Sequence, residues 1–111
     1  MKPKKVLIID DEQDFGVLMT SFFKAKNIEA FVASTIAEGM RLLEEEKPDY
    51  IFLDNNLPDG LGWSKTDHIL VNYPHVHLNL ISAMDVPKTS ASAFRILYKP
   101  FLHEELVEMF K

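Results

Sequence analysis

The sequence of 111 residues contains no cysteine. This absence excludes a disulfide framework, a thiolate metal site and a cysteine nucleophile. A chain without cysteine is compatible with a reducing compartment, and we expect this chain to be cytoplasmic.

Long hydrophobic runs are also missing. The amino-terminus is basic, but the apolar run that follows it covers only residues 6–9 and is too short for a signal peptide. No stretch approaches the roughly 20 apolar residues that a membrane-spanning helix requires. We therefore expect no membrane insertion.

Positive charge is the third deficit. The formal net charge is −5, and the lysines and arginines form no stripe along the sequence. Direct binding to nucleic acid is therefore not expected. What the sequence does contain is 47% hydrophobic and 26% charged residues, as in an ordinary globular protein. Its length suits one domain over residues 1–111.

Short apolar runs between turn residues predict five strands. Residues 6–9 are apolar without interruption, as expected for a strand buried on both faces of a parallel sheet. Residues 75–81 instead alternate, and the face that carries His77 and Asn79 should be less buried. The predicted strands are residues 6–9, 29–33, 49–54, 75–81 and 95–98.

Apolar residues at helical spacing predict helices between these strands. Asp14 is a candidate N-cap of the first helix and Asn27 a candidate stop. Thr35 and Glu38 form a capping box at the start of the second helix. Residues 84–92 leave room for only one or two helical turns. The predicted helices are residues 14–26, 35–46 and 60–72, and a short last helix carrying Leu102, Leu106, Met109 and Phe110.

Strands that alternate with helices imply βαβ units and a parallel sheet covered by helices on both faces. Five such strands suit the flavodoxin-like, doubly wound α/β fold with strand order 2-1-3-4-5. In open sheets of this kind, ligands bind beyond the carboxyl ends of the strands. Polar residues at those ends are therefore the candidate functional residues.

Four of the predicted strands end on polar side chains. Asp10 and Asp11 follow the first strand, and Asp54 ends the third. Ser82 follows the fourth strand and Lys99 the fifth. These strands are neighbours in the proposed order, so the five side chains should converge. Asp54 by itself would more often be a turn residue, and its functional interpretation depends on this convergence.

Three converging carboxylates repel one another and require a cation. Lys99 supplies one positive charge, and hard oxygen ligands of this kind suit Mg²⁺. A carboxylate can also act as a nucleophile and form an aspartyl-phosphate. Phosphoryl transfer needs mainly positioning and charge neutralisation, which a cation, an ammonium and a hydroxyl supply.

Four motifs occur in order, each at a strand end. They are Val-Leu-Ile-Ile-Asp-Asp-Glu at residues 6–12, Phe-Leu-Asp-Asn-Asn-Leu-Pro-Asp-Gly at 52–60, Ser-Ala at 82–83 and Lys-Pro-Phe at 99–101. Across nearly the whole chain, from residue 6 onward, they resemble the response-regulator receiver domains of two-component signalling. By that resemblance Asp54 is the phosphoacceptor and Ser82 the switch hydroxyl. Lys99 pairs with the phosphoryl group, and its bond to Pro100 is expected to be cis.

The resemblance also assigns the metal ligands and the partners. Asp10, Asp11 and Asp54 hold Mg²⁺ together with the main-chain carbonyl of Asn56. The phosphoryl group comes from a sensor histidine kinase or a histidine phosphotransfer protein, and an unidentified downstream protein reads the signal. A second copy of the chain is a further candidate partner. Self-catalysed phosphoryl acceptance and slow autodephosphorylation are the only chemistry expected, so the chain is not an enzyme in the usual sense.

The sequence departs from the family pattern in two places. Receivers commonly carry Tyr or Phe three residues before the lysine, where this chain has Ile96. The nearby aromatic residue of this chain is Tyr98, which directly precedes Lys99. Lys99 follows Ser82 by 17 positions, which shortens the expected fourth helix by more than one turn. Asn56 and Met84 occupy the positions that tune access of the hydrolytic water in the family.

Two other functions are compatible with parts of the pattern. A Mg²⁺-dependent phosphatase also uses an aspartate nucleophile, but its general acid lies two residues later, where this chain has Asn56. A degenerate receiver that acts only as a docking module is the other alternative. His75 and His77 lie two residues apart on a strand, so their side chains should point to the same side and could bind a metal ion. No third ligand accompanies them.

Overall fold

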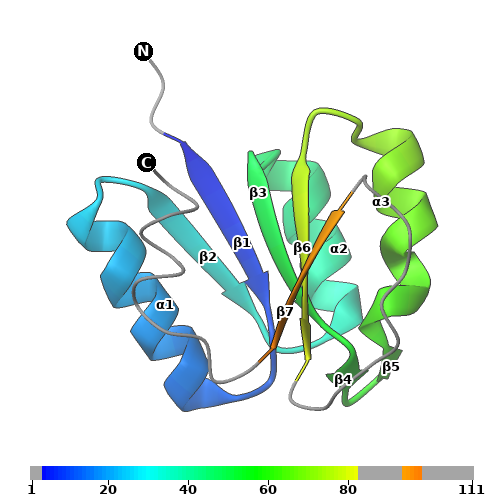
Figure 1. Ribbon diagram of the computed structural model, residues 1–111, viewed down its shortest axis with the longest axis horizontal. Helices are drawn as coiled ribbons and strands as arrows, with labels where there is room; N and C mark the ends of the chain where they lie inside the picture. The colour runs from blue at the N-terminus through cyan, green and yellow to red at the C-terminus, as the bar shows by residue number, and fades with distance from the viewer. Residues whose placement is uncertain (1–3, 83–93, 99–111) are drawn as a thin grey trace.

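The computed structural model describes residues 4–82 and 94–98. Five parallel strands form one sheet in the order β2-β1-β3-β6-β7 (Figure 1). This is the predicted order 2-1-3-4-5, since β6 and β7 are the fourth and fifth strands of the sheet. The α/β, flavodoxin-like fold is therefore confirmed. The strands are β1 (Lys5–Ile9), β2 (Glu29–Ala33), β3 (Tyr50–Asp54), β6 (His77–Ser82) and β7 (Phe94–Tyr98).

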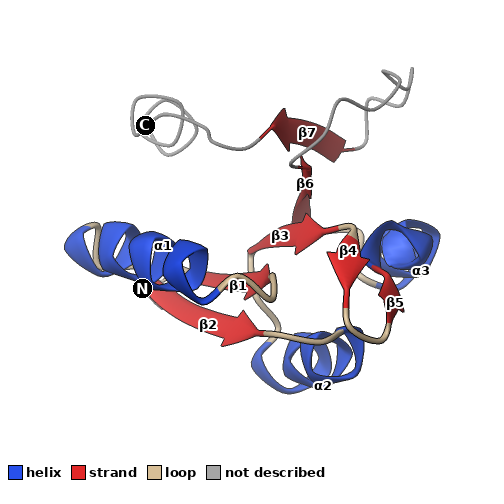
Figure 2. Cartoon of the chain, turned by 90° about the horizontal axis from the view of Figure 1, so that it is seen from below, coloured by secondary structure: helices blue, strands red, loops and turns tan. Residues whose placement is uncertain are grey.

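Helices cover both faces of the sheet in the part of the chain that the structure describes. Helix α1 (Gln13–Ala25) lies on one face, and α2 (Ile36–Glu46) and α3 (Thr66–Asn72) lie on the other (Figure 2). A 3₁₀ helix, η1 (Gly62–Lys65), leads into α3. This two-sided cover explains why β1 and β3 are apolar over most of their length without alternation.

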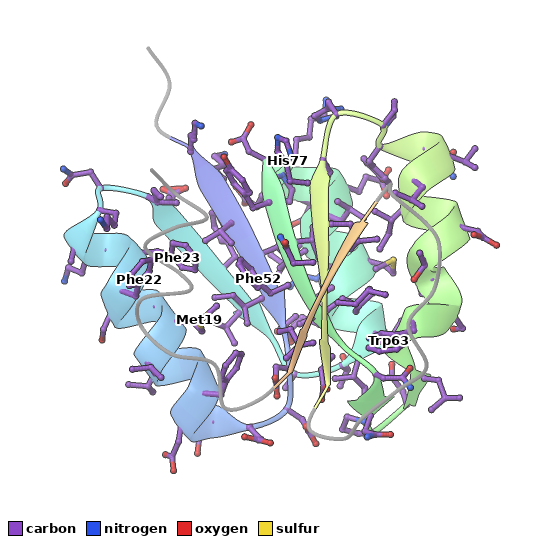
Figure 3. All side chains as sticks on the ribbon, in the orientation of Figure 1. Met19, Phe22, Phe23, Phe52, Trp63 and His77 are labelled. Atoms are coloured by element: carbon purple, nitrogen blue, oxygen red, sulfur yellow. The ribbon has the colours of Figure 1, made fainter. Side chains whose placement is uncertain are left out.

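Alternate residues of each central strand enter separate apolar clusters. In β1, Val6 and Ile8 face α1, whereas Leu7 and Ile9 face α2 and α3. The side chains from α1 project toward Phe52 of β3 in the middle of the sheet (Figure 3). The α1-side cluster consists of Val6, Ile8, Met19, Phe22, Phe23, Phe52 and Ile81.

Two predicted helix signals have the expected geometry. The Thr35 side chain accepts a hydrogen bond from the Glu38 backbone N–H at 3.1 Å and so caps α2. Asn27 has a φ of 60°, a left-handed conformation that asparagine tolerates better than most residues. It lies just after α1 and turns the chain toward β2.

Three local predictions are wrong. The N-cap of α1 is Glu12, not Asp14, because the helix begins at Gln13. Asn79 is buried, with 4% of its surface exposed, and its amide is satisfied there by donating to the Ile51 carbonyl at 3.2 Å. His77 is exposed as expected. The predicted helix 60–72 begins with a strand, β5 (Gly60–Leu61), which pairs antiparallel with β4 (Asn56–Leu57). Hydrogen bonds across this hairpin occupy the backbone and delay the helix.

Other predictions lie outside the described residues. They are the cis bond at Pro100, the shortened fourth helix and the last helix. Among the residues that the structure describes, no helix is long and apolar enough to span a membrane.

We predict that Phe23→Ala lowers the free energy of unfolding by about 3–5 kcal/mol, measured by urea denaturation. Phe23 is fully buried, and its ring packs edge-on against Phe22 at 5.2 Å and beside Phe52 at 5.8 Å between centroids. Leu18→Ala in the same helix is the control, because Leu18 is 62% exposed. Its effect should stay within about 0.5 kcal/mol. Equal effects of the two substitutions would contradict the assigned core.

Candidate metal and phosphoryl site

The carboxyl ends of β1, β3 and β6 meet at one edge of the sheet, the lower edge in Figure 1. Two acidic residues directly follow β1, and β3 ends on Asp54. Parallel strand order alone brings these residues together, because β1 and β3 are neighbours in register. The β4–β5 hairpin lies at the same edge.

Asp10 is fixed in place by its backbone and its side chain. Its N–H donates to the Ala33 carbonyl of β2 at 2.9 Å. One carboxylate oxygen accepts the Glu12 N–H at 2.9 Å, immediately before α1 begins. Only 2% of Asp10 is exposed. The carboxylate is therefore oriented by the turn between β1 and α1.

Asp10, Asp11 and Asp54 form one cluster of carboxylates. One oxygen of each lies within 4.8 Å of the others. Asp54 is 6% exposed, whereas Asp11 is exposed. The cluster thus joins two buried carboxylates to one at the surface, and it offers only hard oxygen donors. It is a candidate site for a divalent cation that prefers oxygen ligands.

A cavity of about 420 Å³ opens beside this cluster. Its walls include Asp10, Asp11 and Gly16 of α1, together with Val32 of β2 and Glu38 of α2. Asp10 and Asp11 therefore border an open space, whereas Asp54 is not part of its lining. An ion can approach these two carboxylates from this side.

The segment after Asp54 is tied back to β3. The Asn55 carbonyl accepts the Gly62 N–H at 2.8 Å, and the Asn55 side-chain oxygen accepts the Trp63 N–H at 3.1 Å. The indole N–H of Trp63 donates to the Leu53 carbonyl at 3.1 Å. A Cβ at Gly62 would overlap with the backbone carbonyl oxygen of Asp54. These contacts hold the end of β3, and with it the backbone of Asp54.

Asp59, at the turn of the hairpin, contacts a different element. Its two carboxylate oxygens accept the N–H groups of Ile36 at 2.8 Å and Ala37 at 3.0 Å. These hydrogen bonds, chiefly that from Ile36, hold the pKa of the Asp59 carboxyl below its ordinary value. The contact links the loop after Asp54 to the start of α2.

The remaining predicted residues are placed only in part. Ser82 ends β6, one position beyond the partner of Asp54 in the β3–β6 register. Asn56 begins β4, two residues after Asp54. In the β6–β7 register, Ile96 lies opposite Leu80. Lys99 and Met84 lie outside the described residues.

The histidine pair is far from the acidic cluster. His77 lies at the opposite edge of the sheet (Figure 3), where its ring stacks on Tyr50 with 5.0 Å between centroids. The acidic cluster is the one group of three or more potential metal ligands in the described part of the chain, and it does not include His75 or His77.

Three residues that support the site, Asp59, Gly62 and Trp63, are not identified by the sequence reasoning. Their contacts join positions between 7 and 23 residues apart, which no local pattern displays. The Asp-Gly pair at residues 59–60 indicates a turn but not the element that the turn contacts.

The fold and the site define a class of protein: a flavodoxin-like α/β domain with an acidic, oxygen-lined site at the carboxyl edge of its sheet. Residues 6–111 match the response regulator receiver domain family. The chain belongs to this family, and it is a receiver domain of the two-component response regulator type. Receiver domains of this type act with histidine kinases or phosphotransfer proteins.

Several known proteins are similar to this chain. The response regulator protein PilR of Pseudomonas aeruginosa is 30% identical over 105 residues, which cover 90% of this chain and 24% of PilR. The KDP operon transcriptional regulatory protein KdpE of Escherichia coli is 31% identical, over 86% of this chain and 44% of KdpE. The chain thus spans less than half the length of these relatives. A two-component response regulator from Clostridium difficile superposes with a TM-score of 0.86 at 26% identity, over 97% of this chain and 93% of that structure.

Proposed function

We propose that Asp54 accepts a phosphoryl group from the phosphohistidine of a sensor histidine kinase or a histidine phosphotransfer protein. The observation that carries this proposal is the convergence of Asp54 with Asp10 and Asp11 within 4.8 Å. Membership of the receiver domain family supports it. The cavity beside the cluster is lined by Asp10 and Asp11, the two carboxylates next to Asp54.

The transfer requires one bond to form and one to break. A carboxylate oxygen of Asp54 attacks the phosphorus, and a P–O bond forms as the P–N bond to the histidine breaks. The electron pair of the broken bond returns to the imidazole nitrogen, which takes up a proton. The protein contributes mainly position, because phosphoryl transfer needs little further covalent machinery. The hydrogen bonds from Gly62 and Trp63 to Asn55 fix the strand end that carries Asp54.

The donor set fits Mg²⁺, which is commonly held by one or two carboxylates and further oxygen ligands. We propose that the carboxylates of Asp10, Asp11 and Asp54 and the main-chain carbonyl of Asn56 hold this ion. When bound, the ion neutralises the negative charge of the carboxylates and of the phosphoryl oxygens. Asp10 is already oriented for this role by its hydrogen bond from Glu12.

Ser82 and Lys99 complete the proposed site. The family resemblance assigns them to the phosphoryl oxygens, Ser82 as hydroxyl donor and Lys99 as cation. For the protein as a whole, we propose that a downstream protein recognises the phosphorylated state. We also propose that the chain can pair with a second copy of itself. We further propose that the domain is phosphorylated once and loses the group slowly, without turnover of other phosphate esters.

A small acyl phosphate tests this function. Incubation with Mg²⁺ should add one phosphoryl group, detected as a single mass increment in the intact protein. The same reaction with excess EDTA should give no increment. Multiple turnovers on a small phosphate ester would instead indicate a phosphatase, and the absence of any adduct would indicate a docking module.

A further inference from the structure

The loop between Asp54 and Gly62 is anchored at both its base and its tip. At the base, the Asn55 carbonyl and side chain accept hydrogen bonds from Gly62 and Trp63. In the middle, Leu57 is 9% exposed and belongs to the core cluster on the α2 side. The tip is the turn that carries Asp59. Asn56, whose carbonyl is a proposed metal ligand, lies between the base and the tip.

The tip contact joins two parts of the chain that are distant in sequence. Both oxygens of Asp59 are used, on Ile36 and Ala37, the first two residues of α2. The Ile36 side chain is itself 8% exposed and reaches the backbone of Gly60, where its terminal carbon would lie 3.4 Å from an added Cβ. Asp59 therefore accepts a hydrogen bond from Ile36, whose side chain is already fixed by packing in the core.

The local cap of α2 is a separate contact. Thr35 already supplies the local cap of α2, through its bond to the Glu38 N–H. Asp59 adds a bidentate contact from a loop 22 and 23 residues away and is mostly exposed itself. Its additional effect is to fix the loop relative to α2, and the loop carries Asn56.

We propose that Asp59 is a positioning residue of the metal site, which holds the Asn56 carbonyl in place by anchoring its loop to the start of α2. This inference rests on the proposed function, since it concerns the site that would hold Mg²⁺. If the anchored loop binds the ion more tightly, bound ion must stabilise the anchor to the same extent. The N–H groups of Ile36 and Ala37 report this stabilisation directly.

The test compares two variants that each remove a cap of α2. Asp59→Ala removes the loop contact, whereas Thr35→Ala removes only the local cap and is the control for the loss of helix capping. Mg²⁺ affinity is measured by the fluorescence of Trp63, the only tryptophan of the chain. We expect Asp59→Ala to weaken Mg²⁺ binding about 5-fold or more, as for a typical coupling between sites. Thr35→Ala should change it by less than about twofold, although both variants weaken the same helix end.

A second measurement uses the unaltered chain. Mg²⁺ should slow amide hydrogen exchange at Ile36 and Ala37 more than at Glu38, whose N–H is bonded to Thr35 and not to the loop. Equal Mg²⁺ affinities of the Asp59→Ala and Thr35→Ala variants, or equal protection of the three amides, would overturn the positioning role alone. No Mg²⁺ binding by the unaltered chain would overturn the proposed metal site as well.

Discussion

Asp11→Ala should lower the affinity for Mg²⁺ by about tenfold or more. Asp11 is the exposed member of the carboxylate cluster, with an oxygen within 4.8 Å of those of Asp10 and Asp54. The site has few charged oxygen ligands, so the loss of one of them strongly weakens binding of a hard cation. Titration of Mg²⁺ against the fluorescence of Trp63 measures the change, because the Trp63 indole is bonded to the Leu53 carbonyl beside Asp54.

Asp14→Ala is the matched control for this substitution. Asp14 is an exposed carboxylate in the first turn of α1 and lies outside the cluster. Both variants remove one negative charge, so the net charge of the domain changes equally. If the two variants bind Mg²⁺ with the same affinity, Asp11 is not a ligand.

Gly62→Ala should destabilise the domain by about 3 kcal/mol and weaken Mg²⁺ binding at the same time. The added methyl group would overlap with the Asp54 carbonyl oxygen and approach the side chains of Leu53 and Leu57 to 3.0 Å. The overlapping atom belongs to the backbone and not to a flexible side chain, so the overlap can be relieved only if the end of β3 shifts. Urea denaturation and Mg²⁺ titration measure the two consequences.

Gly16→Ala serves as the control for the effect of a glycine replacement. A Cβ at Gly16 would lie 3.2 Å from a methyl group of Val32, which is a side chain and can move. Gly16 also lies in helix α1, where alanine is favoured over glycine by up to about 1 kcal/mol. Gly16 lines the cavity beside the carboxylates but does not touch the end of β3, so Gly16→Ala should change Mg²⁺ affinity less than Gly62→Ala does. An unaffected Mg²⁺ affinity in Gly62→Ala would show that Asp54 does not depend on this close contact.

The fold is largely predictable from the sequence because its signals are local. Residues 6–9 are continuously apolar, and β1 is indeed covered by helices on both faces. The Thr35 cap marks the start of α2 within one residue. The convergence of the three carboxylates then follows from the strand order, since each lies at a strand end.

What the sequence does not reveal depends on contacts between distant residues. Asn79 looks like a surface residue in an alternating strand, but the Ile51 carbonyl on the neighbouring strand accepts its amide. The β4–β5 hairpin replaces the predicted start of a helix because Asn55 bonds to Gly62. Asp59 looks like a simple turn residue until its partners at the start of α2 are known.

The proposed site is anchored on one side by elements that the sequence predicts and on the other by elements that it does not. Asp10 and Asp54 owe their positions to β1 and β3, whose apolar residues form the centre of both core clusters. The proposed Asn56 ligand instead depends on the Asp59 contact and on the Asn55 hydrogen bonds. The roles of Ser82 and Lys99 stay predictions from the family resemblance.

The most direct test of the central claim is the intact mass of the protein after incubation with a small acyl phosphate and Mg²⁺. The unaltered chain should gain one phosphoryl group, and the Asp54→Ala variant should gain none. An adduct of equal yield on Asp54→Ala, or no adduct on the unaltered chain, would contradict the assignment of Asp54 as phosphoacceptor.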